Sequence, residues 1–268
     1  MQDNVNKILE THQTPEGILR LLLNDPKNKN ALSDNLMMQL KEQLFKASSD
    51  NSIKVIIIAA VGDVFCSGHN LKELTDARGN EDDGESYFLE LFNLCSSLMQ
   101  MIISCSKPVI AEINGVATAA GCQLVASCDL AIASDSSKFA TPGVNIGLFC
   151  STPMVALSRN VSKKDSMKML LTGDMINAEE AKRISLINDH VSDDKLNDSV
   201  MSLAKKIASK PLSTVKIGKD AFYRQYEMSL TEAYEFTSKV MTDNSLSDDA
   251  KEGIASFLEK RNPVWRDD

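Results

Sequence analysis

The sequence predicts an α/β fold with a largely parallel β-sheet, followed by a helical C-terminal part. The first observation is a set of short apolar runs of strand length, at Ile18–Leu23, Val55–Ala60 and Val109–Ile113. The second is the helical spacing of leucines between the first two runs, and the third is that no strand is evident after about residue 198. Near-continuous apolar strands that alternate with helices are typical of parallel sheets covered on both faces.

The remaining elements of the sheet-bearing part follow in order. The leucine spacing predicts a helix over 33–49. A second helix is expected over 87–103, where apolar residues recur every three or four positions, and Pro108 closes it before the third strand. A further strand is expected over 130–133, so strands and helices alternate through this part of the chain.

The last third of the chain has helical signals only. Asn177 and Ser229 are each followed three residues later by a glutamate, a pattern typical of helix N-termini. Four segments with apolar residues at helical spacing predict helices: Leu203–Ile207, Val215–Phe222, Tyr234–Met241 and Ile254–Leu258. We therefore expect a core domain over 1–197 and a helical C-terminal region over 198–268.

Composition excludes some classes of function. The chain has 268 residues, of which 43% are hydrophobic, which is enough to bury a large core. Its formal net charge of -8, without a block of basic residues, argues against a nucleic-acid partner, because such a protein needs cations along the phosphate backbone.

The cysteines and the N-terminus suggest a compartment. The 6 cysteines include no CxxC pair, so we expect free thiols in a reducing environment. The first residues lack the apolar or arginine-rich character of a targeting segment, and no apolar stretch approaches the roughly 20 residues that span a bilayer. The sequence thus predicts a cytoplasmic protein without a membrane partner.

Two loops are candidates for a binding site. The segment 64–74 follows a strand, and ligand sites in open α/β sheets lie at the carboxyl ends of strands; a simple surface turn around Gly68 is the alternative. The segment 119–121 follows another strand and opens a helix whose first N–H groups have no partner within it. Close packing of a helix on a strand is the alternative for these small residues.

Together these loops resemble a known family. FCSGHNLKEL resembles the pattern FxAGxDLKEM, and INGVATAAGCQLVASCDLAIAS resembles NGxAxGGGxELAxxCDxxxA. Further segments resemble other patterns of the same family, in the same order between Ile18 and Trp265: LLNDPKNKNALSDNL, KFATPGVNIGL, LLTGDMINAEEAKRISLINDHV and FLEKRNPVW. On these motifs the chain is similar to the crotonase, or enoyl-CoA hydratase/isomerase, family.

The resemblance implies a fold and a type of chemistry. The fold would be the crotonase (ClpP-like) spiral of repeated ββα units, with a helical C-terminal region that forms trimers or dimers of trimers. The family binds acyl-CoA thioesters and holds the thioester oxygen between two main-chain N–H groups, which fall here on His69 and Ala120. Such donors stabilise the developing enolate by roughly 3 to 4 kcal/mol each. Coenzyme A would arrive as part of the substrate, so the resemblance implies neither a separate cofactor nor a metal.

The resemblance also assigns coenzyme A contacts. They would come from the two loops, from the segment before the first helix, and from the C-terminus of a neighbouring subunit. The residues are Lys29, Ala31, Cys66, Gly68, His69, Asn70, Leu71, Lys72, Ala120, Phe257 and Lys260.

The chain departs from the family where hydratases carry two glutamates. The matching residues are Gln123 and Gly143, and neither can transfer a proton near neutral pH. A third family position, used as an acid or a nucleophile in some branches, falls on Ser151. Losing one general acid or base costs about 10²- to 10⁴-fold in rate, so little hydration is expected. Catalysis by the Glu112 carboxylate is a further hypothesis, and catalysis by the His69 imidazole is another.

Three functions remain open at this stage. The first is a lyase of the hydratase/isomerase family, active in fatty-acid metabolism with an atypical site. The second is a malonyl-type acyl-CoA decarboxylase, since decarboxylation needs a site that stabilises the enolate and a dry pocket but no strong base. The third is a non-catalytic protein that only binds acyl-CoA.

Overall fold

The core of the protein contains two β-sheets. The computed structural model describes residues 7–266, and its larger sheet has six strands in the order β1-β2-β3-β5-β7-β10. The smaller sheet has the order β4-β6-β8-β9. The strands are β1 (Leu9–Gln13), β2 (Ile18–Leu23), β3 (Val55–Ala60), β4 (Val64–Cys66), β5 (Val109–Ile113), β6 (Val116–Thr118), β7 (Leu130–Ser134), β8 (Lys138–Ala140), β9 (Ile176–Asn177) and β10 (Asp189–Val191).

The chain alternates between these sheets. Strands β3, β5 and β7 pair in parallel in the larger sheet, and each is followed directly by a strand of the smaller one, where β4, β6 and β8 also pair in parallel. Helices α2 (Leu71–Ala77) and α3 (Glu85–Ser104) then lead from β4 to β5, and α4 (Ala120–Ser127) leads from β6 to β7. This is the spiral of ββα units that the resemblance implied.

The helices lie on both sides of the sheets and in a C-terminal arm. They are α1 (Asp34–Ser49), α2 (Leu71–Ala77), α3 (Glu85–Ser104), α4 (Ala120–Ser127), α5 (Ser151–Asn160), α6 (Lys163–Thr172), α7 (Ala178–Arg183), α8 (Leu196–Ala208), α9 (Leu212–Tyr226), α10 (Leu230–Ser245) and α11 (Asp248–Glu259). The expected caps are present, since the side chains of Asn177 and Ser229 accept hydrogen bonds from the N–H groups of Glu180 and Glu232.

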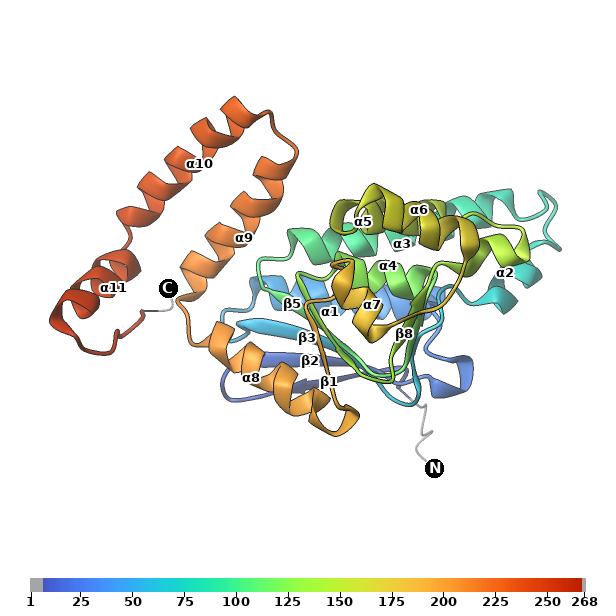
Figure 1. Ribbon diagram of the computed structural model, residues 1–268, viewed down its shortest axis with the longest axis horizontal. Coiled ribbons are helices and arrows are strands. Elements are labelled where there is room, and N and C mark those ends of the chain that lie inside the picture. Colours follow the sequence, from blue (N-terminus) through green and yellow to red (C-terminus); the bar gives the residue numbers. More distant parts are fainter. Residues whose placement is uncertain (1–6, 267–268) are drawn as a thin grey trace.

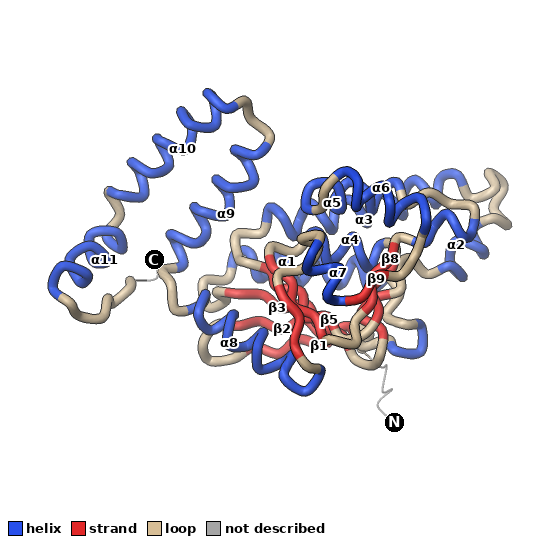
Figure 2. Tube along the Cα trace, viewed as in Figure 1, coloured by secondary structure: helices blue, strands red, loops and turns tan. Residues whose placement is uncertain are grey.

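The larger sheet is covered on both faces, as the apolar strands predicted (Figure 2). Alternate residues of β2 and β3 pack against helices α1 and α3 on one face and against α8 on the other. Strands β2 and β3 are therefore buried on both sides.

Helix α3 corrects a statement made from the sequence. With 20 residues and a mean hydropathy of 1.2, it is long and apolar enough to cross a membrane by length and composition alone. One face of α3, including Leu91, Cys95 and Leu98, is buried in the core, and core helices of globular proteins meet the same criterion.

Helices α9, α10 and α11 form an arm that extends away from the sheets (Figure 1). The boundary expected at residue 198 falls inside α8, which packs against the sheet. A buried ion pair fixes the start of the arm: Lys219 Nζ in α9 lies 2.7 Å from Asp129 Oδ2 and also donates to the carbonyls of Ile102 and Lys107. The O–H of Tyr223 donates to the second oxygen of the same aspartate.

Candidate functional site

The two candidate loops touch each other. A Cβ atom placed on Gly68 would lie 3.3 Å from the amide nitrogen of Ala120 and 3.2 Å from the carbonyl oxygen of Thr118. The Thr118 hydroxyl donates to the carbonyl of Ser67, at 3.0 Å. The structure therefore brings the residues that flank His69 against the start of helix α4, and the turn around Gly68 is more than an isolated surface turn.

The start of α4 is shaped for close approach. Gly121 has no room for a side chain, because a Cβ atom there would lie 2.1 Å from the carbonyl oxygen of Cys66. Ala119 has φ 51° and ψ -119°, a conformation that residues with a side chain rarely adopt. Among residues 7–266, the backbone hydrogen bonds that join loops and element ends include none donated by the amides of His69 or Ala120.

The segment before α1 supports the first loop. The Ser67 N–H donates to the carbonyl of Lys29, and the Leu32 N–H donates to the carbonyl of Gly68. Sequence reasoning passed over Asn30, although it belongs to the quoted family motif. Its side chain is completely buried and donates to the carbonyls of Val61 and Val64.

The predicted coenzyme A contacts divide into two groups. Lys29, Ala31 and the residues 66–72 lie in the adjoining loops just described, with Lys29 and Lys72 exposed. Phe257 and Lys260 belong to the end of the arm, on the opposite side of the molecule from α2 (Figure 1). One chain therefore does not bring these two groups together.

The positions of the missing glutamates have different surroundings. Gln123 is buried in α4, and its Oε1 atom accepts a weak hydrogen bond from the thiol of Cys95, with a sulfur to oxygen distance of 3.8 Å. Gly143 is enclosed, because a Cβ atom would lie 2.7 Å from the carbonyl oxygen of Leu148 and 2.9 Å from the sulfur of Cys150. A longer side chain at residue 143 therefore requires the backbone to move.

The other polar candidates fall outside this region or bind locally. Ser151 is exposed, and its hydroxyl contacts only the nearby carbonyl of Phe149 at 3.4 Å. Glu112 forms a two-pronged ion pair with the guanidinium of Arg20 in β2. Both side chains lie on the sheet face that packs against α8, so Glu112 points away from α4, as strand alternation suggested.

The His69 imidazole lies inside the protein. Its ring packs edge-on against Phe92 of α3, with 5.5 Å between ring centres, and neither ring nitrogen has a hydrogen-bond partner. Burial lowers the pKa of His69, while the nearby carbonyl of Leu32 and carboxylate of Asp34 oppose this shift. The ring is therefore neutral near pH 7.

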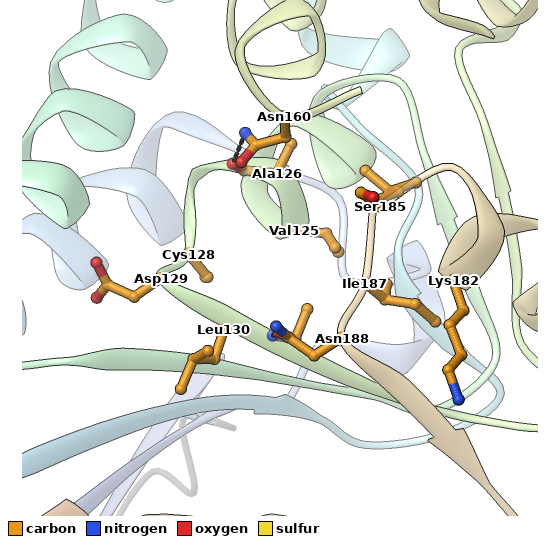
Figure 3. Close-up of a pocket in the computed structure, with 12 residues that line it drawn as sticks. Val125, Ala126, Cys128, Asp129, Leu130, Asn160, Lys182, Ser185, Ile187 and Asn188 are labelled. Atoms are coloured by element: carbon orange, nitrogen blue, oxygen red, sulfur yellow. Dashed lines mark hydrogen bonds between the residues drawn. The ribbon is translucent and has the colours of Figure 1, made fainter. Parts of the chain in front are cut away.

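One cavity is separate from these loops. Its volume is about 380 Å³, and none of the predicted site residues lines it. Figure 3 shows the residues around it. The residues around it are Val125, Ala126, Cys128, Asp129, Leu130, Ala131, Asn160, Lys182, Ser185, Leu186, Ile187 and Asn188. Several of its polar groups are already paired: the Asn160 side chain donates to the carbonyl of Ala126, and Lys182 pairs with Asp189.

Comparison with known proteins agrees with the fold and the motifs. The family profile described as Enoyl-CoA hydratase/isomerase matches residues 13–268. Enoyl-CoA hydratase domain-containing protein 3, mitochondrial, is 49% identical in Xenopus laevis, with 94% of this chain and 84% of that protein aligned. The human protein of the same name is also 49% identical, over 93% of this chain and 81% of that protein.

Solved structures have the same fold. The crystal structure of human enoyl Coenzyme A hydratase domain-containing protein 3 superposes with a TM-score of 0.92 at 47% identity, covering 97% of this chain and 100% of that one. An enoyl-CoA hydratase from Mycobacterium smegmatis gives a TM-score of 0.92 at 42% identity, covering 96% and 98% of the two chains.

The same relatives correct the predicted location. We expected a cytoplasmic protein, but the Xenopus and human relatives are named as mitochondrial, so that expectation is wrong. The character of the cysteines and of the first residues, on which the expectation rested, therefore did not indicate the compartment. Sequence motifs, ββα topology and relatives agree that the chain belongs to the enoyl-CoA hydratase/isomerase family.

Proposed function

We propose that this protein binds acyl-CoA thioesters and stabilises their enolates with the peptide N–H groups of His69 and Ala120. The contact between the two loops supports this most directly. A Cβ atom placed on Gly68 would lie only 3.3 Å from the Ala120 nitrogen. Ala120 is the first residue of α4, so its N–H also lies at the positive end of a helix dipole. Two such donors favour negative charge on a thioester oxygen.

The coenzyme A part of the substrate would lie along the first loop. Residues 66–72, together with Lys29 and Ala31, form adjoining backbone segments. The exposed ammonium groups of Lys29 and Lys72 suit the phosphates of coenzyme A. In this proposal coenzyme A is part of the substrate rather than a resident cofactor.

Hydration would be slow in this protein. Gln123 cannot transfer a proton, and Gly143 has neither a side chain nor space for one. Each missing acid or base lowers a rate by about 10²- to 10⁴-fold.

Decarboxylation of a malonyl-type acyl-CoA is the second candidate, and the orientation of Gln123 favours it. The Oε1 atom of Gln123 accepts the hydrogen bond from the Cys95 thiol, and the amide NH₂ group of Gln123 is then the group that can donate to a ligand. A donor suits the carboxylate that such substrates carry. If thioesters bind and none reacts, the protein is a non-catalytic acyl-CoA binding protein.

The arm fits assembly into trimers or dimers of trimers. Ile254, Phe257 and Leu258 of α11 are 60%, 84% and 73% exposed, which is unusual for apolar side chains on one short helix. In an oligomer this helix would cover a neighbouring subunit, and Phe257 and Lys260 could then reach its ligand. Light scattering of the full chain tests this assembly.

The site is tested by removing one donor. Ala120→Pro removes an N–H at the first position of a helix, where proline is tolerated, and Lys163→Pro makes the same change at the exposed first position of α6. We expect Ala120→Pro to weaken or slow thioester processing by about 10²- to 10³-fold, and Lys163→Pro to leave it unchanged. Calorimetry and a mass-spectrometric panel of enoyl-, malonyl- and 3-hydroxyacyl-CoA thioesters measure binding and turnover. Equal behaviour of the two folded variants contradicts the proposal.

A further inference from the structure

Unpartnered polar atoms lie beside the first loop. Among the described residues, both ring nitrogens of His69 and the Oδ1 atom of Asp34 are buried without a hydrogen-bond partner. Leaving such an atom unpaired costs about 1 to 3 kcal/mol. Since native structures pair nearly all buried polar atoms, a local group of exceptions indicates a place where a ligand or a proton is handled.

Backbone geometry places Asp34 beside His69. Leu32 and His69 are paired as in a parallel ladder, and the Leu32 N–H donates to the Gly68 carbonyl at 2.7 Å. The backbone of Ser33 is extended, with φ -71° and ψ 159°. In an extended segment residues two apart point to the same face, so Asp34 shares the face of Leu32 and of its paired residue His69. The Asp34 carboxylate is close enough to act on the charge of the His69 ring.

The Asp34 carboxylate is held from one side only. Tyr87 of α3 donates its O–H to Oδ2 of Asp34 at 3.1 Å, and the N–H of Asp34 donates to Glu73 of α2. Burial, and then the nearby Asp34 carboxylate, raise the pKa of Tyr87, so its phenol keeps the proton and remains a donor. Oδ1 is the carboxylate oxygen that remains without a partner.

The His69 ring is suited to moving a proton. A neutral imidazole has one nitrogen that donates and one that accepts. The backbone N–H of the same residue is one of the two proposed contacts of the thioester oxygen, so the side chain is carried by the loop that would hold the reacting group. Gln123 and Gly143, which replace the usual acids, cannot do this work.

Building on the proposed function, we propose that the His69 imidazole transfers the proton at the α-carbon of the bound acyl-CoA, and that Asp34, held by Tyr87, orients the ring. In this step the α-carbon to hydrogen bond breaks and the proton passes to the free ring nitrogen. The electron pair forms the carbon–carbon double bond of the enolate, and the thioester oxygen takes the negative charge between the two N–H groups. Return of the proton to the carbon restores the thioester, so no oxidant or other reactant is consumed. Asp34 and Tyr87 are positioning residues.

The experiment follows deuterium at the α-carbon. Hexanoyl-CoA is incubated in D₂O with the full-length protein, and mass spectrometry measures deuterium uptake. We expect the wild type to catalyse exchange and His69→Gln to lose about 10²- to 10⁴-fold of that rate, with thioester affinity retained in calorimetry. His12→Gln is the matched control, because His12 is exposed on β1.

The pH profile separates the role of Asp34 from a structural one. The charged group that acts on the ring is the carboxylate of Asp34 in α1. Glu73 of α2 and Tyr87 of α3 are hydrogen-bonded to Asp34. The Asp34 carboxylate favours the protonated ring, so Asp34→Asn lowers the pKa of His69. The limb on which exchange rises with pH should then move to lower pH, while the maximal rate falls because the base is weaker.

The exchange and binding measurements distinguish failure of this inference from failure of the proposed function. Exchange that survives His69→Gln, or a wild type that binds the thioester without exchange, overturns this inference and leaves the proposed oxyanion contacts standing. An Asp34→Asn variant that loses rate without a displaced limb overturns the positioning role of Asp34. If no CoA thioester binds at all, the proposed function and this inference both fail.

Discussion

Gly68 faces Ala119 across the contact between the two loops, where a Cβ atom on Gly68 would lie 2.9 Å from the Cβ atom of Ala119. Both residues also have positive φ, 97° for Gly68 and 51° for Ala119. The position of the proposed thioester contacts therefore depends on two closely packed backbone segments, of which the one at Ala119 is strained.

The first prediction concerns Gly68. Gly68→Ala should destabilise the protein by about 2 to 5 kcal/mol, because positive φ and overpacking both oppose a side chain here. Denaturant unfolding measures the change. Gly218→Ala is the matched control: Gly218 lies in the exposed part of α9 with nothing near its missing Cβ, so this change should stabilise the helix by up to about 1 kcal/mol. Equal effects of the two substitutions contradict the packing described for Gly68.

The second prediction has the opposite sign. Ala119→Gly relieves a conformation that costs about 1 to 3 kcal/mol and adds about 0.4 to 1 kcal/mol of chain entropy to the unfolded state. The net effect should be a melting temperature higher by about 2 to 4 °C, measured by calorimetry. A lower melting temperature means that Ala119 is not strained.

The third prediction concerns the missing glutamates. Gln123→Glu should raise crotonyl-CoA hydration above the wild-type level, since it restores one proton-transferring group of similar size. Adding Gly143→Glu should lower stability by about 1 to 3 kcal/mol without a further gain, because Leu148 and Cys150 leave no space. Loss of enoyl absorbance measures hydration, and Gln123→Met is the neutral control. Full hydratase activity in the double variant would show that the loop around Gly143 adapts easily.

The fourth prediction concerns the arm. Lys219→Met leaves Asp129 buried without its cation, which should cost about 3 to 5 kcal/mol of unfolding free energy in urea titrations. Lys239→Ala breaks an exposed pair with Asp243 in α10 and should cost less than about 0.5 kcal/mol. Similar small losses in both variants would mean that the Lys219 contacts do not fix the arm.

The fifth prediction concerns the thiols. All six cysteines are free and buried, and burial raises the pKa of Cys66, Cys95 and Cys122 to about 12. Because the thiolate is the reactive form, the folded protein should react with a thiol reagent at pH 8 far more slowly than the protein in urea. Rapid labelling of the folded protein at one of these three cysteines contradicts this burial.

The regular part of the fold was visible in the sequence. Strands β2, β3 and β5 lie at the predicted residues, because continuous apolar runs bounded by turns leave little choice of secondary structure. Strands β4, β6 and β8 were not predicted. Each has three residues, too few for a recognisable period, and each depends on partners distant in the sequence.

The site could be predicted only in part. Motifs indicated the loops around His69 and Ala120, and the structure places these loops in contact. Sequence alone did not show that Asp34 lies near His69, because the bridge between Leu32 and His69 joins distant segments. It also could not show that Gly143 is enclosed, since the contacts that enclose it come from the fold of the following loop.

The enclosure of Gly143 also bears on how this chain could change in evolution. A codon change at residue 123 can exchange the amide for an acid within the existing helix, whereas at residue 143 the main chain of the following turn occupies the volume that an acid needs. Gain of a second acid at residue 143 would therefore take coordinated remodelling of a loop. Independent point mutations can supply only one of the two acids.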